Sequence, residues 1–94
     1  MEYVTAEGIV NGPVRSAKIA RIDFADFRME VVSMVGEKVD FEGDEVVVKL
    51  QGKPALATKS LKSGKRVRVI GSLAVETGML LADSLEALDE EEKR

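Results

Sequence analysis

The sequence predicts an all-β domain with a small helical contribution, in which five strands close into a small barrel. Hydrophobic and polar residues alternate along five segments, which is the pattern of strands with one buried face. The chain contains 13 valines but only four aromatic residues, which favours a β-rich core of small branched side chains. Its 94 residues are enough for one domain with a compact core.

The first strand is predicted over residues 3–10, where small or apolar residues occupy every second position. The run Asn11-Gly12-Pro13 is typical of a turn and is expected to end this strand. The face expected to point inward carries Val4, Ala6, Gly8 and Val10.

A second strand is predicted to begin at Lys18. Alternation breaks at Ala25-Asp26 and then resumes, which indicates a bulge or a bend. Residues 32–39 fit either an extension of this strand or a loop. The expected inward residues are Ala20, Ile22 and Phe24 before the break, and Phe27, Met29 and Val31 after it.

The third strand is predicted over residues 45–50, with Val46, Val48 and Leu50 inward. Gly52-Lys53-Pro54 then opens a short helix, because proline is well tolerated in the first turn. Gly64 is expected to end this segment in a left-handed conformation. The inner stripe of the helix is expected to be Leu56, Ala57, Ser60 and Leu61.

The fourth strand is predicted over residues 65–73, with Val67 and Val69 inward. A bend is expected at Gly71. A hairpin turn at Glu76-Thr77-Gly78 leads to a fifth strand that begins at Met79. Residues 83–88 fit a continued strand or the start of a helix.

Five strands with one short helix between the third and the fourth is the element order of the OB-fold, a small curved barrel. The alternative is a smaller β-roll of similar order. We expect residues 1–88 to form the OB-fold domain and residues 89–94 to form an acidic, charged tail.

The composition argues against several functional classes. The chain has no cysteine and no histidine, so it lacks the thiolate nucleophile, the usual general base and the commonest metal ligands. We therefore expect neither an enzyme nor a cofactor. No apolar run approaches the ~20 residues of a membrane span, and the first residues lack a signal sequence, so the expected location is cytoplasmic.

An acidic turn has the spacing that begins a calcium loop, with carboxylates at Asp40, Glu42 and Asp44. Glu45 occupies the position that needs glycine, and Gln51 stands where the bidentate glutamate is required. No metal site is therefore predicted.

Three stretches of this chain resemble the OB domains of single-stranded DNA-binding proteins and of archaeal replication protein A. Residues 46–71 contain a strand that runs into GKPAL and a helix that runs into LKSGKRVRVIG. The closing ETGMLLADSLEAL and the opening VTAEGIVNGP also resemble these families, whereas residues 25–43 depart from them. The resemblance implies binding of single-stranded nucleic acid, DNA in preference to RNA, without catalysis and with little sequence preference.

The charge distribution is consistent with such a polyanion partner. Residues 46–75 contain seven basic residues and no acidic one, while the other seven basic residues share the rest of the chain with all 17 acidic residues. OB-folds bind oligonucleotides across strands 2 and 3 and the adjoining loops. The predicted phosphate contacts are Arg15, Lys18, Arg21, Arg28, Lys49, Arg66 and Arg68.

Base stacking requires exposed rings, and the sequence offers few. Phe27 follows the break in the second strand, and Tyr3 falls on the outward face of the first. These two are the predicted stacking residues. Phe24 is expected in the core, and the alternative for Phe27 is also the core.

Two alternatives remain open at this stage. The cations can form a solvated face that balances nearby carboxylates, for which Glu7, Asp23 and Glu30 are the candidates. The domain can also be an accessory module that binds another protein subunit, since apolar residues such as Val47 and Ile70 are predicted on its outer face.

Overall fold

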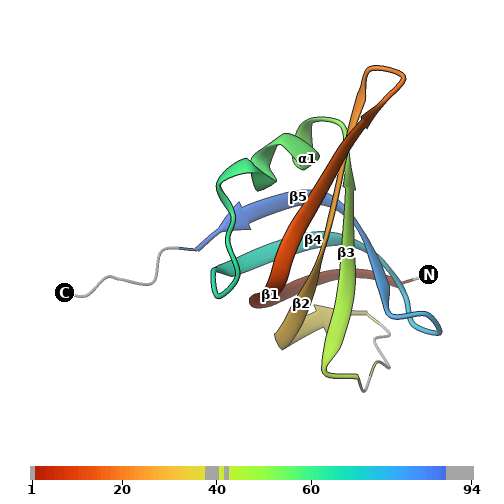
Figure 1. Ribbon diagram of the computed structural model, residues 1–94. Coiled ribbons are helices and arrows are strands. Elements are labelled where there is room, and N and C mark those ends of the chain that lie inside the picture. The colour runs from red at the N-terminus through yellow and green to blue at the C-terminus, as the bar shows by residue number, and fades with distance from the viewer. Residues whose placement is uncertain (1, 38–40, 42, 89–94) are drawn as a thin grey trace.

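The computed structural model describes residues 2–37, 41 and 43–88, which form a five-stranded barrel with a helical segment at one side (Figure 1). The barrel is closed, with the strand order β1-β2-β3-β5-β4. This confirms the predicted OB-fold with a short helix between the third and fourth strands. The elements are β1 (Glu2–Ile19), β2 (Ile22–Gly36), β3 (Glu45–Gln51), α1 (Lys53–Leu56), η1 (Ala57–Ser60), β4 (Arg66–Ala74) and β5 (Met79–Ala87).

The strand β1 closes the barrel because it pairs with β2 along one edge and with β4 along the other. The circuit is completed by a parallel pairing of β3 with β5 and an antiparallel pairing of β5 with β4. A register shift follows Ile70, and the next residue, Gly71, is buried. A side chain at Gly71 would lie 2.7 Å from the Cα atom of Ala82, so this close approach requires glycine.

The core follows the predicted alternation on three of the five strands. On β1, β3 and β4 the residues predicted to point inward are buried, and on β5 Leu80 fills the same layer. Phe27 and Met29 complete this core from β2, and they are 2% and 0% exposed. Every one of these strands has polar neighbours on the outside, so the ligand-accessible surface is the outer wall.

The helical segment packs through a different stripe from the one predicted. The buried residues are Ala55, Thr58 and Leu61, whereas Leu56 is 42% exposed. Their spacing of three residues is the period of a 3₁₀-helix, which the chain adopts in η1. The Thr58 hydroxyl donates a 2.7 Å hydrogen bond to the carbonyl oxygen of Ala55, which satisfies this buried side chain. Gly64 has the expected left-handed φ of 93°, three residues beyond Leu61.

The predicted end of the first strand was wrong. Asn11-Gly12-Pro13 does not end β1 but lies at a register shift between Asn11 and Arg15, after which the strand continues to Ile19. Proline is tolerated at such a bulge because the ladder of hydrogen bonds is interrupted there. The turn instead occurs at Ala20-Arg21, since Ile19 pairs directly with Ile22.

The inward residues predicted for β2 were right at Phe27 and Met29 and wrong before Ala25, because the break expected at Ala25-Asp26 does not occur. The register shift near Pro13 lies in β1, so β2 alternates without interruption from Ile22 to Val31 and buries Ala25, Phe27 and Met29. Ala20 is a turn residue, Ile22 is 40% exposed, and Phe24 is only partly buried.

Beyond the barrel, β1 and β2 continue as a two-stranded arm, seen at the top of Figure 1. The pairing of β1 with β4 ends at Ile9, and the pairing of β2 with β3 reaches only to Phe24. The arm therefore ends in a hairpin tip at the pair Ile19↔Ile22, one pair beyond Asp23, whose carbonyl oxygen accepts a hydrogen bond from Gly52.

The segments left open in the sequence are partly settled. Residues 32–36 belong to β2, and β5 continues as a strand to Ala87. The hairpin turn before β5 is confirmed, with Gly78 at a φ of 69°. Residues 38–39 and the predicted tail, 89–94, lie outside the described residues. Among the residues described, none belongs to a helix with the length and apolar character needed to cross a bilayer.

The turn at the hairpin tip yields a stability prediction. Ala20 and Arg21 have φ values of 51° and 70°, as a two-residue type I′ turn requires, but neither is the Asn-Gly that this turn prefers. Replacing them by Ala20→Asn with Arg21→Gly should raise the free energy of unfolding by about 1–2 kcal/mol, because a left-handed conformation costs roughly that much outside glycine and asparagine.

The measurement is thermal unfolding followed by circular dichroism, with a midpoint several degrees higher than that of the parent. The matched control is Ala17→Asn on the arm itself, which should give no gain because asparagine is disfavoured within strands. An unchanged midpoint for the turn variant would show that the turn carries no strain.

Candidate nucleic-acid interface

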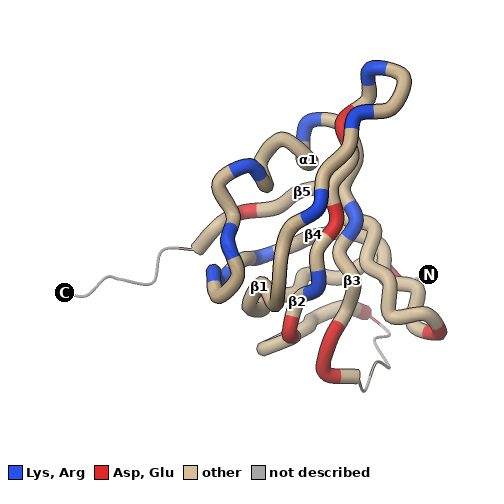
Figure 2. The backbone as a smooth tube through the Cα atoms, in the orientation of Figure 1, with Lys and Arg blue, Asp and Glu red and all other residues tan. Residues whose placement is uncertain are grey.

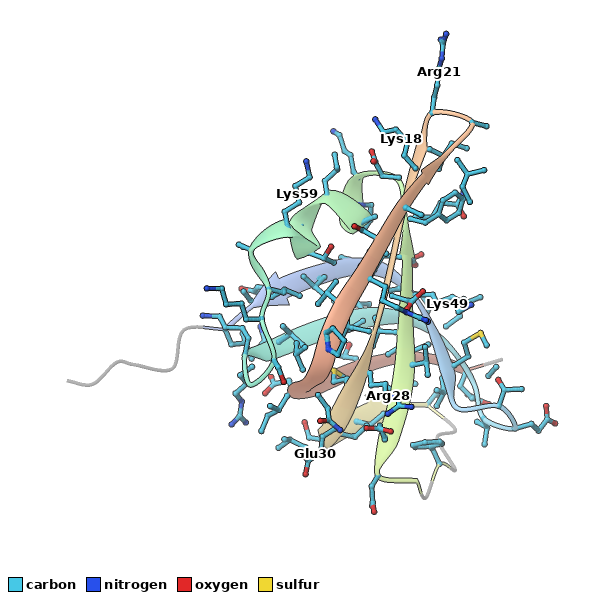
Figure 3. All side chains as sticks on the ribbon, in the orientation of Figure 1. Lys18, Arg21, Arg28, Glu30, Lys49 and Lys59 are labelled. Atoms are coloured by element: carbon cyan, nitrogen blue, oxygen red, sulfur yellow. The ribbon has the colours of Figure 1, made fainter. Side chains whose placement is uncertain are left out.

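The predicted basic residues fall into three groups, two on different parts of the barrel wall and one on the arm. Arg66 and Arg68 lie on β4, opposite Ile9 and Glu7 of β1. Arg28 and Lys49 lie on β2 and β3, as Figure 3 shows. The remaining three, Arg15, Lys18 and Arg21, belong to the arm.

The group on β4 is held by carboxylates. The Nη2 atom of Arg68 lies 2.9 Å from Oε2 of Glu7, and its Nη1 atom lies 3.1 Å from Oε1 of Glu86. Arg66 lies 3.8 Å from the other oxygen of Glu7. The hydrogen bond with Glu7, together with its negative charge, raises the pKa of Arg68 above its ordinary value. This geometry matches the alternative of a balanced, solvated face and leaves little free charge for a phosphate.

Two cations of the arm are also paired. Arg15 lies 3.0 Å from Oδ1 of Asp26, directly opposite it in the register. Lys18 lies 3.8 Å from Asp23. The side chains of Arg15 and Lys18 remain 77% and 66% exposed, so these pairs are surface pairs that a competing anion can replace at small cost.

Arg28, Lys49 and Arg21 differ from the other four cations. Within the part of the chain that the structure describes, none of the three forms an ion pair, and all three are exposed. Figure 2 shows acidic residues where the pairing of β2 with β3 ends away from the arm, and there Glu30 lies opposite Glu45 in the strand register. The face of β2 and β3 thus changes from acidic at that end to basic toward the arm.

The partly exposed ring of Phe24 shares a hollow with Lys49 on this face. Because Ala25 and Phe27 point inward, Phe24 lies on the outer side of β2, opposite Gln51 of β3. It lines a hollow of about 520 Å³ together with Lys49, Gln51 and Leu81. The sequence contained the signal for this: uninterrupted alternation from Ile22 to Arg28 would have placed Phe24 outward.

A second hollow, of about 420 Å³, continues this face past Arg28. It lies between the β1 bulge and β3, with Gly12 and Pro13 on one side and Val47 on the other. The bulge that displaced the predicted turn therefore shapes the surface beside Arg28.

The two predicted stacking residues have different outcomes. Phe27 is 2% exposed in the core, so it offers no face to a base, and its assignment to the site was wrong. Tyr3 is 59% exposed, as predicted. Its hydroxyl donates a 3.0 Å hydrogen bond to Asp83, and this bond raises the pKa of Tyr3 above its ordinary value and holds the ring in place.

Tyr3 belongs to the same surface as Lys49. Around the barrel wall, Tyr3 pairs with Ser72, Ser72 with Leu81, and Leu81 with Lys49. Three strand spacings separate Tyr3 from Lys49, or roughly 14 Å. Leu81, between them, is 41% exposed. Two rings and one apolar side chain thus flank the cation on a continuous outer wall.

The acidic turn shows no metal centre in what the structure describes. No cluster of three or more potential ligands is present among the described residues. Asp40 and Glu42 of the predicted loop lie outside them.

Comparison with known proteins gives one positive result. No family model matches the chain, and no curated protein sequence matches it. Solved structures of two bacterial proteins match it over nearly the whole length of both chains. The small single-stranded DNA-binding protein of Streptomyces coelicolor has a TM-score of 0.72 at 18% identity, covering 98% of this chain and 99% of that one.

The second single-stranded DNA-binding protein of Mycobacterium smegmatis has a TM-score of 0.70 at 18% identity, with 99% and 100% coverage. The single-stranded DNA-binding protein of Thermus aquaticus matches with a TM-score of 0.66 at 15% identity, and the chain spans 51% of that protein. At these identities the comparisons establish a shared fold.

The carboxylate network on β4 yields a prediction. Glu7→Gln should lower the free energy of unfolding by about 0.5–1 kcal/mol, because Glu7 bridges two arginines whose side chains are only 39–40% exposed. The loss should shrink in 1 M salt, which screens such pairs.

The measurement is urea unfolding at low and high salt. The control is Glu76→Gln in the turn before β5, where no described residue forms an ion pair with the carboxylate. If both variants lose the same amount, the arginines are not held by Glu7.

Proposed function

We propose that this domain, residues 1–88, binds single-stranded DNA through the outer face of β2, β3 and β5, without catalysis and with little sequence preference. The observation that carries the proposal is the grouping of Arg28, Lys49 and Phe24 on one wall of the barrel. The shared fold with small single-stranded DNA-binding proteins supports it.

Each of these groups has a distinct part in the mechanism. Arg28 and Lys49 attract the phosphate backbone, since neither is committed to a described carboxylate. Phe24 and Tyr3 offer rings on which unpaired bases stack, at about 1–3 kcal/mol per base. Stacking depends on the flat face that every base has, which explains why little sequence preference is expected.

The same features select a single strand over a duplex. A base in a duplex is covered on both faces by its neighbours, so Phe24 and Tyr3 can stack only on bases that are free. Asp83, bonded to the Tyr3 hydroxyl, places a negative charge at that end of the face. The strand is therefore expected to turn a base toward Tyr3 and its phosphates toward Lys49 and Arg28.

The electrostatic part of this mechanism predicts a salt effect. Arg28→Gln with Lys49→Gln should weaken binding of a labelled oligonucleotide at low salt by about tenfold. It should also reduce the slope of log K against log salt by about 1.4, because each lost phosphate contact on a single strand contributes about 0.7. Fluorescence anisotropy over a salt series measures both quantities.

The matched control is Lys59→Gln with Lys62→Gln, which removes the same charge from the helical side of the molecule. It should change the slope much less. An equal loss in both variants would indicate a response to net charge alone, and no binding by the parent at low salt would refute the proposed function.

The stacking part predicts a specific loss at Phe24. Phe24→Leu keeps an apolar side chain in the hollow but removes the aromatic face, so affinity should fall by about 1–2 kcal/mol while the thermal midpoint changes little. Tyr3 is the only tyrosine and the chain has no tryptophan, so its emission reports directly on a base that reaches β1. Oligonucleotide should quench the tyrosine fluorescence of the parent protein, whereas unchanged fluorescence would exclude Tyr3 from the path of the bound strand.

A second candidate function is favoured by one observation at the other end of β2. Val32 and Val35 are 50% and 69% exposed, beyond the last residue of β2 that pairs with β3. Exposed apolar side chains of this kind fit a contact with another protein subunit. A stoichiometric partner recovered after nuclease treatment, together with no oligonucleotide affinity, would select this function instead.

A further inference from the structure

The tip of the hairpin arm has exposed aliphatic side chains that are not part of the proposed binding face. Ile19 and Ile22 are 61% and 40% exposed, and they form a direct cross-strand pair. Paired residues of antiparallel strands place their side chains on the same side of the ribbon. The arm therefore ends in a small aliphatic surface.

This aliphatic pair is continuous with the proposed binding face. Along β2, residues 22, 24, 26 and 28 alternate with the inward residues Ala25 and Phe27, so Ile22 and Phe24 lie on the same side. They are two residues apart, or roughly 7 Å along the strand. A ligand that occupies the hollow at Phe24 and extends toward the arm would meet the tip next.

Cations accompany the apolar pair. Arg21 occupies the turn itself and points beyond the end of the arm in Figure 3, and among the described residues it has no ion-pair partner. Lys18, paired loosely with Asp23 at 3.8 Å, lies on the other face of the ribbon. An aliphatic surface beside free positive charge is complementary to a ligand with both apolar faces and negative groups.

The turn at the arm tip contains two residues that do not favour its backbone conformation. Ala20 and Arg21 both have positive φ, which asparagine and glycine adopt at lower cost. A strained turn of this kind is associated with functional segments, and here the retained side chain is a cation at the outermost point.

Aromatic and aliphatic side chains contact different forms of nucleic acid. Single bases are held by stacking on aromatic rings, as Phe24 and Tyr3 provide. Branched aliphatic side chains such as isoleucine are instead the wedges that proteins insert between stacked base pairs. We propose that the arm tip, formed by Ile19, Arg21 and Ile22, engages the end of a duplex that adjoins the bound single strand. This inference rests on the proposed function and names its preferred substrate, a single-strand to double-strand junction.

The test compares three DNA ligands by fluorescence anisotropy: a single strand of about 12 nucleotides, the same strand joined to a hairpin duplex, and that duplex with a blunt end. The parent should bind the joined ligand about five- to tenfold more tightly than the single strand, from the apolar surface covered at the tip. Ile19→Ser with Ile22→Ser should abolish this preference and leave the affinity for the single strand unchanged.

A matched control replaces the two exposed valines at the other end of β2, Val32→Ser with Val35→Ser, and should keep the preference. A second readout uses 2-aminopurine in the terminal base pair, whose fluorescence should rise when the parent unstacks it and should not rise with the isoleucine variant.

The outcomes separate this inference from the proposed function. Equal affinity of the parent for the single strand and the joined ligand would overturn the inference alone. A junction preference that survives in the isoleucine variant would overturn it as well. No affinity of the parent for the single strand at low salt would instead refute the proposed function, and the inference with it.

Discussion

The structure depends on the ability of one strand to serve two sheet edges. The strand β1 pairs with β2 and with β4, and this double pairing closes the barrel. This double pairing is possible because residue 8 is glycine. A Cβ atom at Gly8 would lie 2.6 Å from the Cγ atom of Met29. Closure leaves an interior filled with valine, leucine, alanine, Met29 and Phe27, so recognition can occur only on the outer wall and on the arm.

The outer wall gives similar cations different roles. Arg68 forms ion pairs with carboxylates on both neighbouring strands, Glu7 and Glu86, and so links three strands of the barrel. Lys49 has Asp26 opposite it, but that carboxylate is bound to Arg15, so the lysine remains available. The proposed interface therefore arises from the way carboxylates are shared among neighbouring strands. This also explains how an acidic protein can present a basic face.

Sequence patterns predicted most of the fold and less of the site. Alternation identified the buried faces of β1, β3 and β4, and the strand order gave the barrel, because a period of two needs only local residues. The end of β1 was misplaced, since turn chemistry at Pro13 also suits a bulge. A separate error, the break expected at Ala25-Asp26, placed Phe24 in the predicted core, whereas Phe24 is partly exposed and Phe27, a candidate for stacking, is buried.

The sequence by itself determined the class of the domain, the position of its helix and the inward residues of β1, β3 and β4, because these follow from periodicity and from the preferences of individual residues. Only the tertiary structure decided which cations are free, which ring reaches the surface, and that two isoleucines meet at the end of an arm. Those outcomes depend on register between strands distant in the chain, and a bulge of a few residues in β1 changes every neighbour that follows.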